Sequence, residues 1–173
     1  MQVLIVDDDA NFARAAIRGF EREGYQANCA LNAKDARVLA AQKPQWVLLD
    51  LNLQNTSGLL LLPELRQSLS ADARIVILTG YSSIATAVEA TRLGADDYLC
   101  KPAKLKDIIA SFRGERDSSP QIPNEPPSVE RLKWEHIQRL LLENQGNVSA
   151  TARALNMHRR TLQRILSKRP VNR

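Results

Sequence analysis

Apolar and polar positions follow two different periods along residues 1–113. Five short apolar runs have the character of strands, and each is followed by a segment whose apolar residues recur at helical spacing. The predicted strands cover residues 2–6, 25–29, 46–49, 74–78 and 97–100, and the predicted helices cover 11–23, 33–42, 58–69, 83–93 and 105–112. Pro63 lies inside the third predicted helix, and we expect it in or near the first turn, where its missing N–H group costs no hydrogen bond.

Five successive strand–helix units predict an α/β fold with a doubly wound parallel sheet. A strand that is apolar throughout, such as 46–49, is typical of a sheet covered by helices on both faces. Ligands of such folds bind outside the carboxyl ends of the strands. The residues that follow the strands are therefore the first candidates for a functional site.

The chain changes character after residue 113. Residues 114–128 contain four prolines and three serines, which predicts a semi-extended linker. The pattern from 129 to 173 is helical, with breaks at Gly146-Asn147 and Asn156-Met157. The sequence thus predicts an α/β domain over 1–113, a linker over 114–128 and a small all-α domain over 129–173.

Charge separates the two predicted domains. Residues 1–116 carry 14 basic and 14 acidic residues, whereas residues 129–173 carry ten basic and three acidic ones, with no acid after Glu143. This asymmetry favours a polyanionic partner for the C-terminal domain. A solvated basic face is the alternative that charge alone leaves open.

The absence of recognisable targeting signals and the low cysteine content point to the cytoplasm. The sequence shows no signal peptide and no apolar run long enough to span a membrane, so we expect a cytoplasmic protein without membrane contact. Cys29 and Cys100 are accordingly expected to be reduced.

Several polar residues follow the predicted strands directly. They are Asp7, Asp8 and Asp9 after the first, Asp50 after the third, Thr79 after the fourth and Lys101 after the fifth. Carboxylates that converge at one sheet edge repel one another, and a hard cation such as Mg²⁺ relieves that repulsion. A lysine and a hydroxyl nearby supply the charge and the hydrogen bond that a phosphoryl group needs. We expect Asp9 to act as a helix N-cap instead.

The motifs in residues 1–113 resemble the receiver domain of two-component response regulators, which has a flavodoxin-like (βα)5 fold. They are Val-Asp7-Asp8, Leu-Leu-Asp50-Leu-Asn52 with Gly58, Leu-Thr79-Gly80 and Tyr98-Leu-Cys-Lys101-Pro102. The resemblance implies that Asp50 accepts a phosphoryl group from a sensor histidine kinase. It also implies that Asp8, Asp50 and the backbone carbonyl of Asn52 bind Mg²⁺, with Asp7 assisting through water.

The same resemblance implies roles for the other strand-end residues. Lys101 would contact the phosphoryl group, Thr79 would hydrogen-bond it, and Tyr98 would rotate inward on activation. The Lys101–Pro102 bond would be cis, and Cys29 and Cys100 would lie on opposite sheet edges, too far apart for a disulfide. Gln54 departs from the proline of many relatives, which puts the local loop shape in doubt. We expect no enzymatic activity beyond Mg²⁺-dependent phosphorylation and dephosphorylation of Asp50 itself.

The C-terminal domain contains a helix-turn-helix pattern that resembles the Fis type. In such a unit the second helix enters the major groove by its N-terminal end, and arginine pairs well with guanine. The candidate DNA-binding residues are Asn147, Ser149, His158, Arg159, Arg160, Thr161, Gln163 and Arg164. Arg159 and Arg160 are expected to reach bases, and Ser149 to meet a phosphate.

The full-length arrangement resembles the RegA/ActR/PrrA class of response regulators. That resemblance implies a membrane sensor kinase as partner, and a homodimer that forms on phosphorylation and binds double-stranded DNA to regulate transcription. Two alternatives stay open at this point. The basic helices could dock a protein partner in a signalling relay. Alternatively, the acidic site could belong to a haloacid-dehalogenase-like phosphatase, with Asp7-Asp8-Asp9 as its Asp-x-Asp motif and the first Asp as nucleophile.

Overall fold

The structure, a computed structural model, describes residues 1–53, 56–80, 84–115 and 129–167. Five parallel strands form the central sheet of the first domain, in the order β2-β1-β3-β6-β7. They are β1 (Gln2–Val6), β2 (Gln26–Ala30), β3 (Trp46–Leu49), β6 (Arg74–Thr79) and β7 (Asp97–Cys100). The predicted doubly wound sheet is confirmed. Because β2 and β7 are its two edges, Cys29 and Cys100 lie apart, and both are free thiols.

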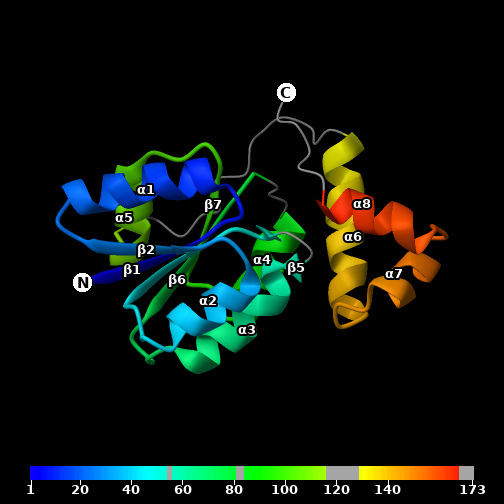
Figure 1. The fold of residues 1–173 in the computed structure, drawn as a ribbon, viewed down its shortest axis with the longest axis horizontal. Coiled ribbons are helices and arrows are strands. Elements are labelled where there is room, and N and C mark those ends of the chain that lie inside the picture. The colour runs from blue at the N-terminus through cyan, green and yellow to red at the C-terminus, as the bar shows by residue number, and fades with distance from the viewer. Residues whose placement is uncertain (54–55, 81–83, 116–128, 168–173) are drawn as a thin grey trace.

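Five helices cover the two faces of this sheet (Figure 1). They are α1 (Ala10–Arg22), α2 (Ala33–Ala40), α3 (Gly58–Ser68), α4 (Ile84–Arg92) and α5 (Leu105–Arg113). Alternate residues of each strand point to opposite faces. Ile5 and Leu48 therefore pack in one core with α1 and α5, whereas Leu4 and Val47 pack in the other with α2, α3 and α4.

The segment between β3 and α3 differs from the expectation. It contains a short antiparallel hairpin of β4 (Asn52–Leu53) and β5 (Thr56–Ser57), which no pattern in the sequence indicated. Ser57 is the N-cap of α3, so the helix begins at Gly58 and Pro63 falls in its second turn. The helix begins at Gly58 as predicted, and Pro63 lies near its first turn but not within it. Gln54 lies outside the described residues.

Three helices form the second domain: α6 (Val129–Glu143), α7 (Val148–Ala154) and α8 (Arg159–Ser167). Their core consists of residues spaced along each helical stripe, namely Trp134, Ile137, Leu141, Ala152, Leu162 and Leu166. α5 ends at Gly114 in the left-handed conformation, and residues 116–128 of the predicted linker lie outside the described ranges. None of the helices in those ranges combines the length and the apolar character that crossing a bilayer requires.

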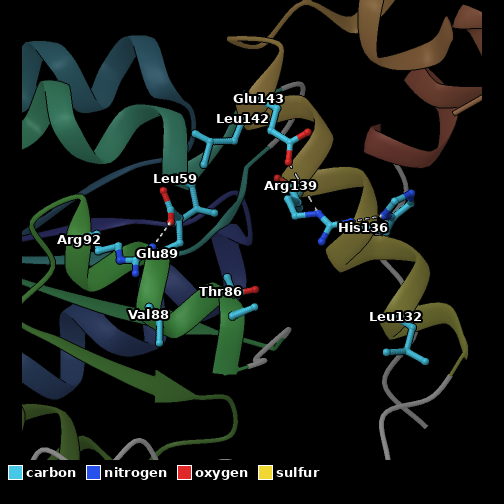
Figure 2. A pocket seen from close by; sticks show the side chains of 12 residues that line it. Leu59, Thr86, Val88, Glu89, Arg92, Leu132, His136, Arg139, Leu142 and Glu143 are labelled. Carbon is cyan, nitrogen blue, oxygen red and sulfur yellow. Dashed lines mark hydrogen bonds and ion pairs between the residues drawn. The ribbon is translucent and has the colours of Figure 1, made fainter. Parts of the chain in front are cut away.

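α6 lies alongside the first domain and contacts β5 (Figure 1). Next to this contact, a groove of about 540 Å³ separates α6 from α4 (Figure 2). Val88 and Glu89 of α4 line one side of the groove, and Leu132, His136 and Arg139 of α6 line the other. The two domains therefore touch at a small area beside an open groove.

Candidate functional site

Three carboxylates gather where β1 and β3 end. Val6 and Leu49 are partners in the parallel register, and the N–H of Asp50 donates to the carbonyl of Val6 at 2.9 Å. The residues that follow the two strands therefore lie side by side, with carboxylate oxygens of Asp7, Asp8 and Asp50 within 4.8 Å of one another. Asp7 and Asp50 are buried (2% and 7% exposed), while Asp8 is half-buried. The predicted acidic cluster thus forms from residues far apart in the chain.

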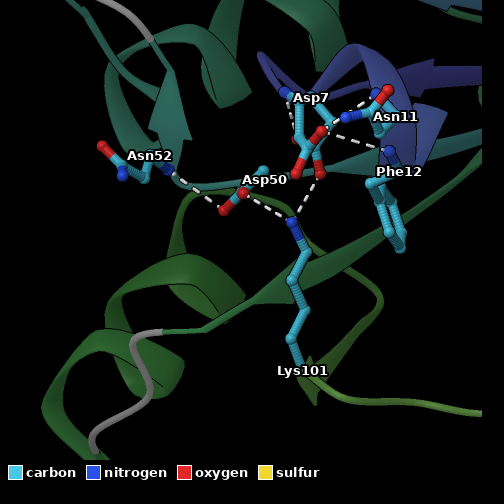
Figure 3. Close-up of polar contacts among 7 residues, drawn as sticks. Asp7, Asn11, Phe12, Asp50, Asn52 and Lys101 are labelled. Carbon is cyan, nitrogen blue, oxygen red and sulfur yellow. Dashed lines mark hydrogen bonds and ion pairs between the residues drawn. The ribbon is translucent and has the colours of Figure 1, made fainter. Parts of the chain in front are cut away.

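Lys101 brings a positive charge to this cluster from the end of β7 (Figure 3). Its Nζ donates to Asp7 Oδ2 at 2.5 Å and to Asp50 Oδ2 at 2.7 Å. The same Nζ lies 4.5 Å from the centre of the Phe12 ring, a distance at which a cation is attracted by the ring face. The Lys101–Pro102 peptide bond is cis, as the sequence predicted. Lys101 therefore bridges the two buried carboxylates and is supported by an aromatic residue of α1.

Two groups of the cluster, Asp7 and Lys101, have shifted pKa values. Burial and the neighbouring charge of Asp50 raise the pKa of Asp7 from 3.8 to about 6, although Lys101 acts in the opposite direction. Burial of Lys101 disfavours its charge, but the carboxylates of Asp50 and Asp7 outweigh this effect, so the pKa of Lys101 lies above its ordinary value. Lys101 consequently stays protonated at neutral pH. Its single positive charge does not balance three carboxylates, so a further cation would stabilise the cluster.

The donor set of the cluster suits a hard divalent ion. Three carboxylates offer only oxygen ligands, which Mg²⁺ and Ca²⁺ prefer, and half-buried Asp8 leaves the cluster open to solvent. Asp9 is not part of the set, because its side chain accepts hydrogen bonds from the N–H groups of Asn11 and Phe12 as the N-cap of α1. The predicted separation of Asp9 from Asp7 and Asp8 is confirmed.

The loop after Asp50 is hydrogen-bonded to the Asp50 carboxylate. The N–H of Asn52 donates to Asp50 Oδ1 at 3.1 Å (Figure 3). The N–H of Gly58 donates to the carbonyl of Leu51 at 2.9 Å, and a Cβ at position 58 would lie only 2.3 Å from the backbone oxygen of Asp50. A side chain at Gly58 would therefore displace Asp50, which explains why a glycine stands at this position.

Thr79 and Tyr98 lie on β6 and β7, the two strands that follow β3 in the order of the sheet. Thr79 ends β6, is fully buried, and accepts a hydrogen bond through its carbonyl from the N–H of Lys101 at 2.9 Å. Tyr98 pairs with Ile77 in the register of β6 and β7 and is 6% exposed, so its ring lies inward in this structure. A contact of the Thr79 hydroxyl with a phosphoryl group and a rotation of Tyr98 on activation stay predictions.

The helix-turn-helix of the second domain has the predicted elements. Asn147 caps α7 by accepting hydrogen bonds from the N–H groups of Ser149 and Ala150, both at 3.1 Å. Asn156 adopts a positive φ of 55°, and the N–H of Met157 returns to the carbonyl of Ala152 at 2.9 Å, which closes the turn before α8. These local bonds hold α8 at a defined angle to α7.

The candidate DNA-binding residues lie on the outside of this unit. Leu162 is buried in the core, and Leu155 and Ile165 pack against it, as expected for structural positions. The exposed candidates are Asn147, His158, Arg159, Arg160, Gln163 and Arg164, whereas Ser149 and Thr161 are half-buried. Because Arg159 and Arg160 open α8, their side chains stand at the helix end that a recognition helix directs into the groove.

Residues 3–113 match the response regulator receiver domain family, and residues 128–168 match the bacterial regulatory protein, Fis family. The chain belongs to the response regulators. Its membership in this family excludes the phosphatase alternative. The chain is therefore a transcription-regulating response regulator with a receiver domain and a Fis-type helix-turn-helix that binds DNA.

Three relatives are similar over almost the full chain. The photosynthetic apparatus regulatory protein RegA of Rhodovulum sulfidophilum is 46% identical over 96% of this chain and 91% of its own. The acid tolerance regulatory protein ActR of Rhizobium meliloti is 45% identical over 96% of this chain and 86% of its own. A crystal structure of a response regulator from Burkholderia pseudomallei, with a phosphorylated aspartic acid, calcium ion and citrate, is 47% identical with a TM-score of 0.63, covering 96% of this chain and 99% of the other.

Two features of this response regulator escaped the sequence analysis. Phe12 was interpreted only as part of an apolar helical stripe, yet its ring lies beside the Lys101 ammonium. Gln138 is 6% exposed on α6, although its charge-free polar side chain gave no sign of burial. Helical spacing could have signalled Gln138, because it neighbours Ile137 and Leu141 on the apolar face.

Proposed function

We propose that Asp50 accepts a phosphoryl group from a phosphohistidine of a sensor histidine kinase. In this step an Asp50 carboxylate oxygen forms the new P–O bond while the P–N bond of the donor breaks and the imidazole leaves. The observation that carries the proposal is the position of the Lys101 Nζ, 2.7 Å from Asp50 Oδ2, in a buried site that also holds Asp7. A fixed positive charge there stabilises the negative charge that a phosphoryl group brings.

We propose that Asp8 and Asp50, with the carbonyl of Asn52, hold Mg²⁺, and that Asp7 assists through water. The ion would supply charge neutralisation for the phosphoryl oxygens. The carboxylate oxygens within 4.8 Å of one another support this assignment. The calcium ion and the phosphorylated aspartic acid in the Burkholderia pseudomallei relative support both parts of the proposal.

The test is labelling of the full chain with acetyl phosphate in Mg²⁺. We expect acid-labile, hydroxylamine-sensitive phosphate on the wild type, none in EDTA and none on Asp50→Asn. Appreciable labile phosphate on Asp50→Asn would place the acceptor elsewhere. We propose no activity toward other substrates, so that turnover is limited to the phosphorylation and dephosphorylation of Asp50.

We further propose a division into a receiver over 1–113, a linker over 114–128 and a DNA-binding domain over 129–173. In the last of these, Arg159 and Arg160 would read bases. The remaining contacts, directed mainly to phosphates and neighbouring groups, would come from Asn147, Ser149, His158, Thr161, Gln163 and Arg164. The exposed position of most of these side chains around the start of α8 supports the assignment.

Phosphorylation would produce a homodimer through the face of α4, β7 and α5. Thr79 would couple this face to the phosphoryl group. Tyr98 of β7 pairs in the sheet with Ile77, two residues before Thr79. Receiver dimerisation would join two helix-turn-helix units. Once one unit is bound to DNA, the effective concentration of the second is higher, which raises the overall DNA affinity. Sedimentation of the phosphorylated chain at DNA-binding concentrations tests this part, and a monomer under those conditions would contradict it.

A further inference from the structure

Phe12 lies at the edge of the acidic site, in the first turn of α1. It is half-buried, whereas Phe20 on the same helix is completely buried and has the rings of Tyr25 and Phe112 beside it. The centre of the Phe12 ring lies 4.5 Å from Lys101 Nζ (Figure 3). Packing of α1 on the sheet therefore does not by itself account for an aromatic side chain at position 12.

The position of Phe12 is fixed by residues that also hold Lys101. Oδ1 of Asp7 accepts the N–H of Asp9 at 2.8 Å, and Oδ1 of Asp9 accepts the N–H of Phe12 at 3.2 Å. The other oxygen of Asp7 accepts Lys101 Nζ at 2.5 Å. Together with the contact between the ring and Nζ, these hydrogen bonds form a closed circuit around Asp7. The aromatic ring and the ammonium group are thus placed relative to each other through one shared carboxylate.

The ring differs from the two carboxylates that Lys101 contacts. An Asp50 oxygen that bonds to phosphorus no longer carries the carboxylate charge, and Asp7 neighbours the position that we propose for Mg²⁺. The uncharged ring keeps its attraction for the ammonium in every state of the site, because the attraction arises from the fixed quadrupole of the π electrons. Phe12 is therefore a partner of Lys101 that does not change when the site is used.

The contact matters because a lysine side chain is long and flexible, so its ammonium group must be held in place to act at one position. The Lys101 side chain is 20% exposed, and a cation that has lost most of its water is attracted more strongly by an aromatic face. Nζ lies 2.7 Å from Asp50 Oδ2, where it can meet the negative charge of an incoming phosphoryl group. An aliphatic residue at position 12 would leave this charge present but less well placed.

We propose that Phe12 is a positioning residue for phosphoryl transfer, which holds the Lys101 ammonium at the Asp50 carboxylate through the face of its ring. This inference rests on the proposed phosphorylation of Asp50. It gives the first turn of α1 a part in setting the rate of transfer, in addition to the residues at the strand ends.

The initial rate of phosphorylation of the full chain by acetyl phosphate in saturating Mg²⁺ tests this role, with intact mass recording the adduct. We expect Phe12→Leu to reduce the rate about tenfold, which corresponds to the loss of a cation–π contact of about 1.4 kcal/mol. Phe12→Tyr keeps an aromatic face and should stay within about twofold of the wild type. A trifluorinated phenylalanine at position 12 keeps the shape of the ring but weakens its negative face, and should give an intermediate rate.

Phe20→Leu is the matched control, because it makes the same substitution on the same helix. The Phe20 ring contacts Tyr25 and Phe112, which do not belong to the acidic site. Under conditions in which circular dichroism shows all chains to be folded, Phe20→Leu should be phosphorylated at the rate of the wild type.

Four outcomes would contradict the proposal. A wild-type rate in Phe12→Leu would overturn the role of Phe12 and leave Asp50 as the acceptor. A wild-type rate with the trifluorinated ring would mean that the ring acts through its size and not through its attraction for the ammonium. A rate in Phe20→Leu as low as that of Phe12→Leu would assign the loss to the packing of α1. Absence of any adduct on the wild type would overturn the proposed phosphorylation, and this inference with it.

Discussion

The receiver and the DNA-binding domain carry their functional residues in opposite environments. Asp7 and Asp50 are almost fully buried and share one lysine, whereas Arg159 and Arg160 are exposed at the start of α8. Burial strengthens the interactions among the acidic residues and raises the pKa of Asp7, while exposed arginines are screened by salt. The acidic site should therefore respond to single substitutions and to pH, and the basic surface to ionic strength.

The largest effect is expected from Asp8, which we propose as a direct metal ligand. Asp8→Ala removes one of three clustered carboxylates, and we expect it to weaken Mg²⁺ binding by at least about 100-fold. Lys101→Ala should keep Mg²⁺ affinity but respond poorly to phosphorylation, since its charge faces Asp50. Calorimetric titration with MgCl₂ measures the Mg²⁺ affinity of both variants. Equal Mg²⁺ affinity in Asp8→Ala and the wild type would contradict this division of roles.

A pH effect on folding should follow from Asp7. Its pKa is raised from 3.8 to about 6 in the folded state, so the folded chain holds a proton that the unfolded chain has already released. Stability in EDTA should therefore fall as pH rises from about 4 to about 6, and level off above that. The loss should be on the order of 3 kcal/mol.

Asp7→Asn removes this titration. We expect it to be more stable than the wild type at pH 7 in EDTA and to lose the decline between pH 4 and 6, because Lys101 still pairs with Asp50. Urea unfolding at a series of pH values measures the difference. Parallel stability curves for the two chains would mean that Asp7 does not hold the raised pKa.

The basic surface should yield smaller effects of a different kind. Arg159→Ala should lose roughly 1–3 kcal/mol of DNA-binding free energy per half-site. It should also discriminate less between bases at one guanine position. Binding to specific and scrambled DNA measures this loss. An equal loss of affinity on both DNAs would assign Arg159 to the phosphate backbone.

The smallest effect is expected from Arg164, which lies one turn further along α8. Arg164→Ala should weaken binding to all DNA sequences by a similar factor. It should also reduce the slope of the logarithm of the binding constant against the logarithm of the salt concentration by about one unit. A salt titration of binding provides the measurement, with Arg159→Ala as the comparison. A changed base preference in Arg164→Ala would reverse the two assignments.

Local patterns in the sequence were enough to predict the five strands of the central sheet and the helices of both domains. Apolar periodicity identified the strands and helices, and short polar side chains identified Asp9 as a cap that the structure confirms. The order of strand-end residues was enough to predict the acidic cluster, because the carboxyl ends of parallel strands meet at one edge of a sheet. These predictions depend only on neighbours in the chain or on the rules of parallel sheets.

Tertiary structure alone decided the features that depend on distances between distant segments. Packing of the core places the ends of the strands close to one another. This proximity produces the bridge of Lys101 to both Asp7 and Asp50, its contact with Phe12 and the raised pKa of Asp7. Leu60 of α3 packs against the second domain, and the β4–β5 hairpin that precedes α3 is too short to leave a periodic pattern. Periodicity indicates which face of an element is buried, but packing determines which distant residue it meets.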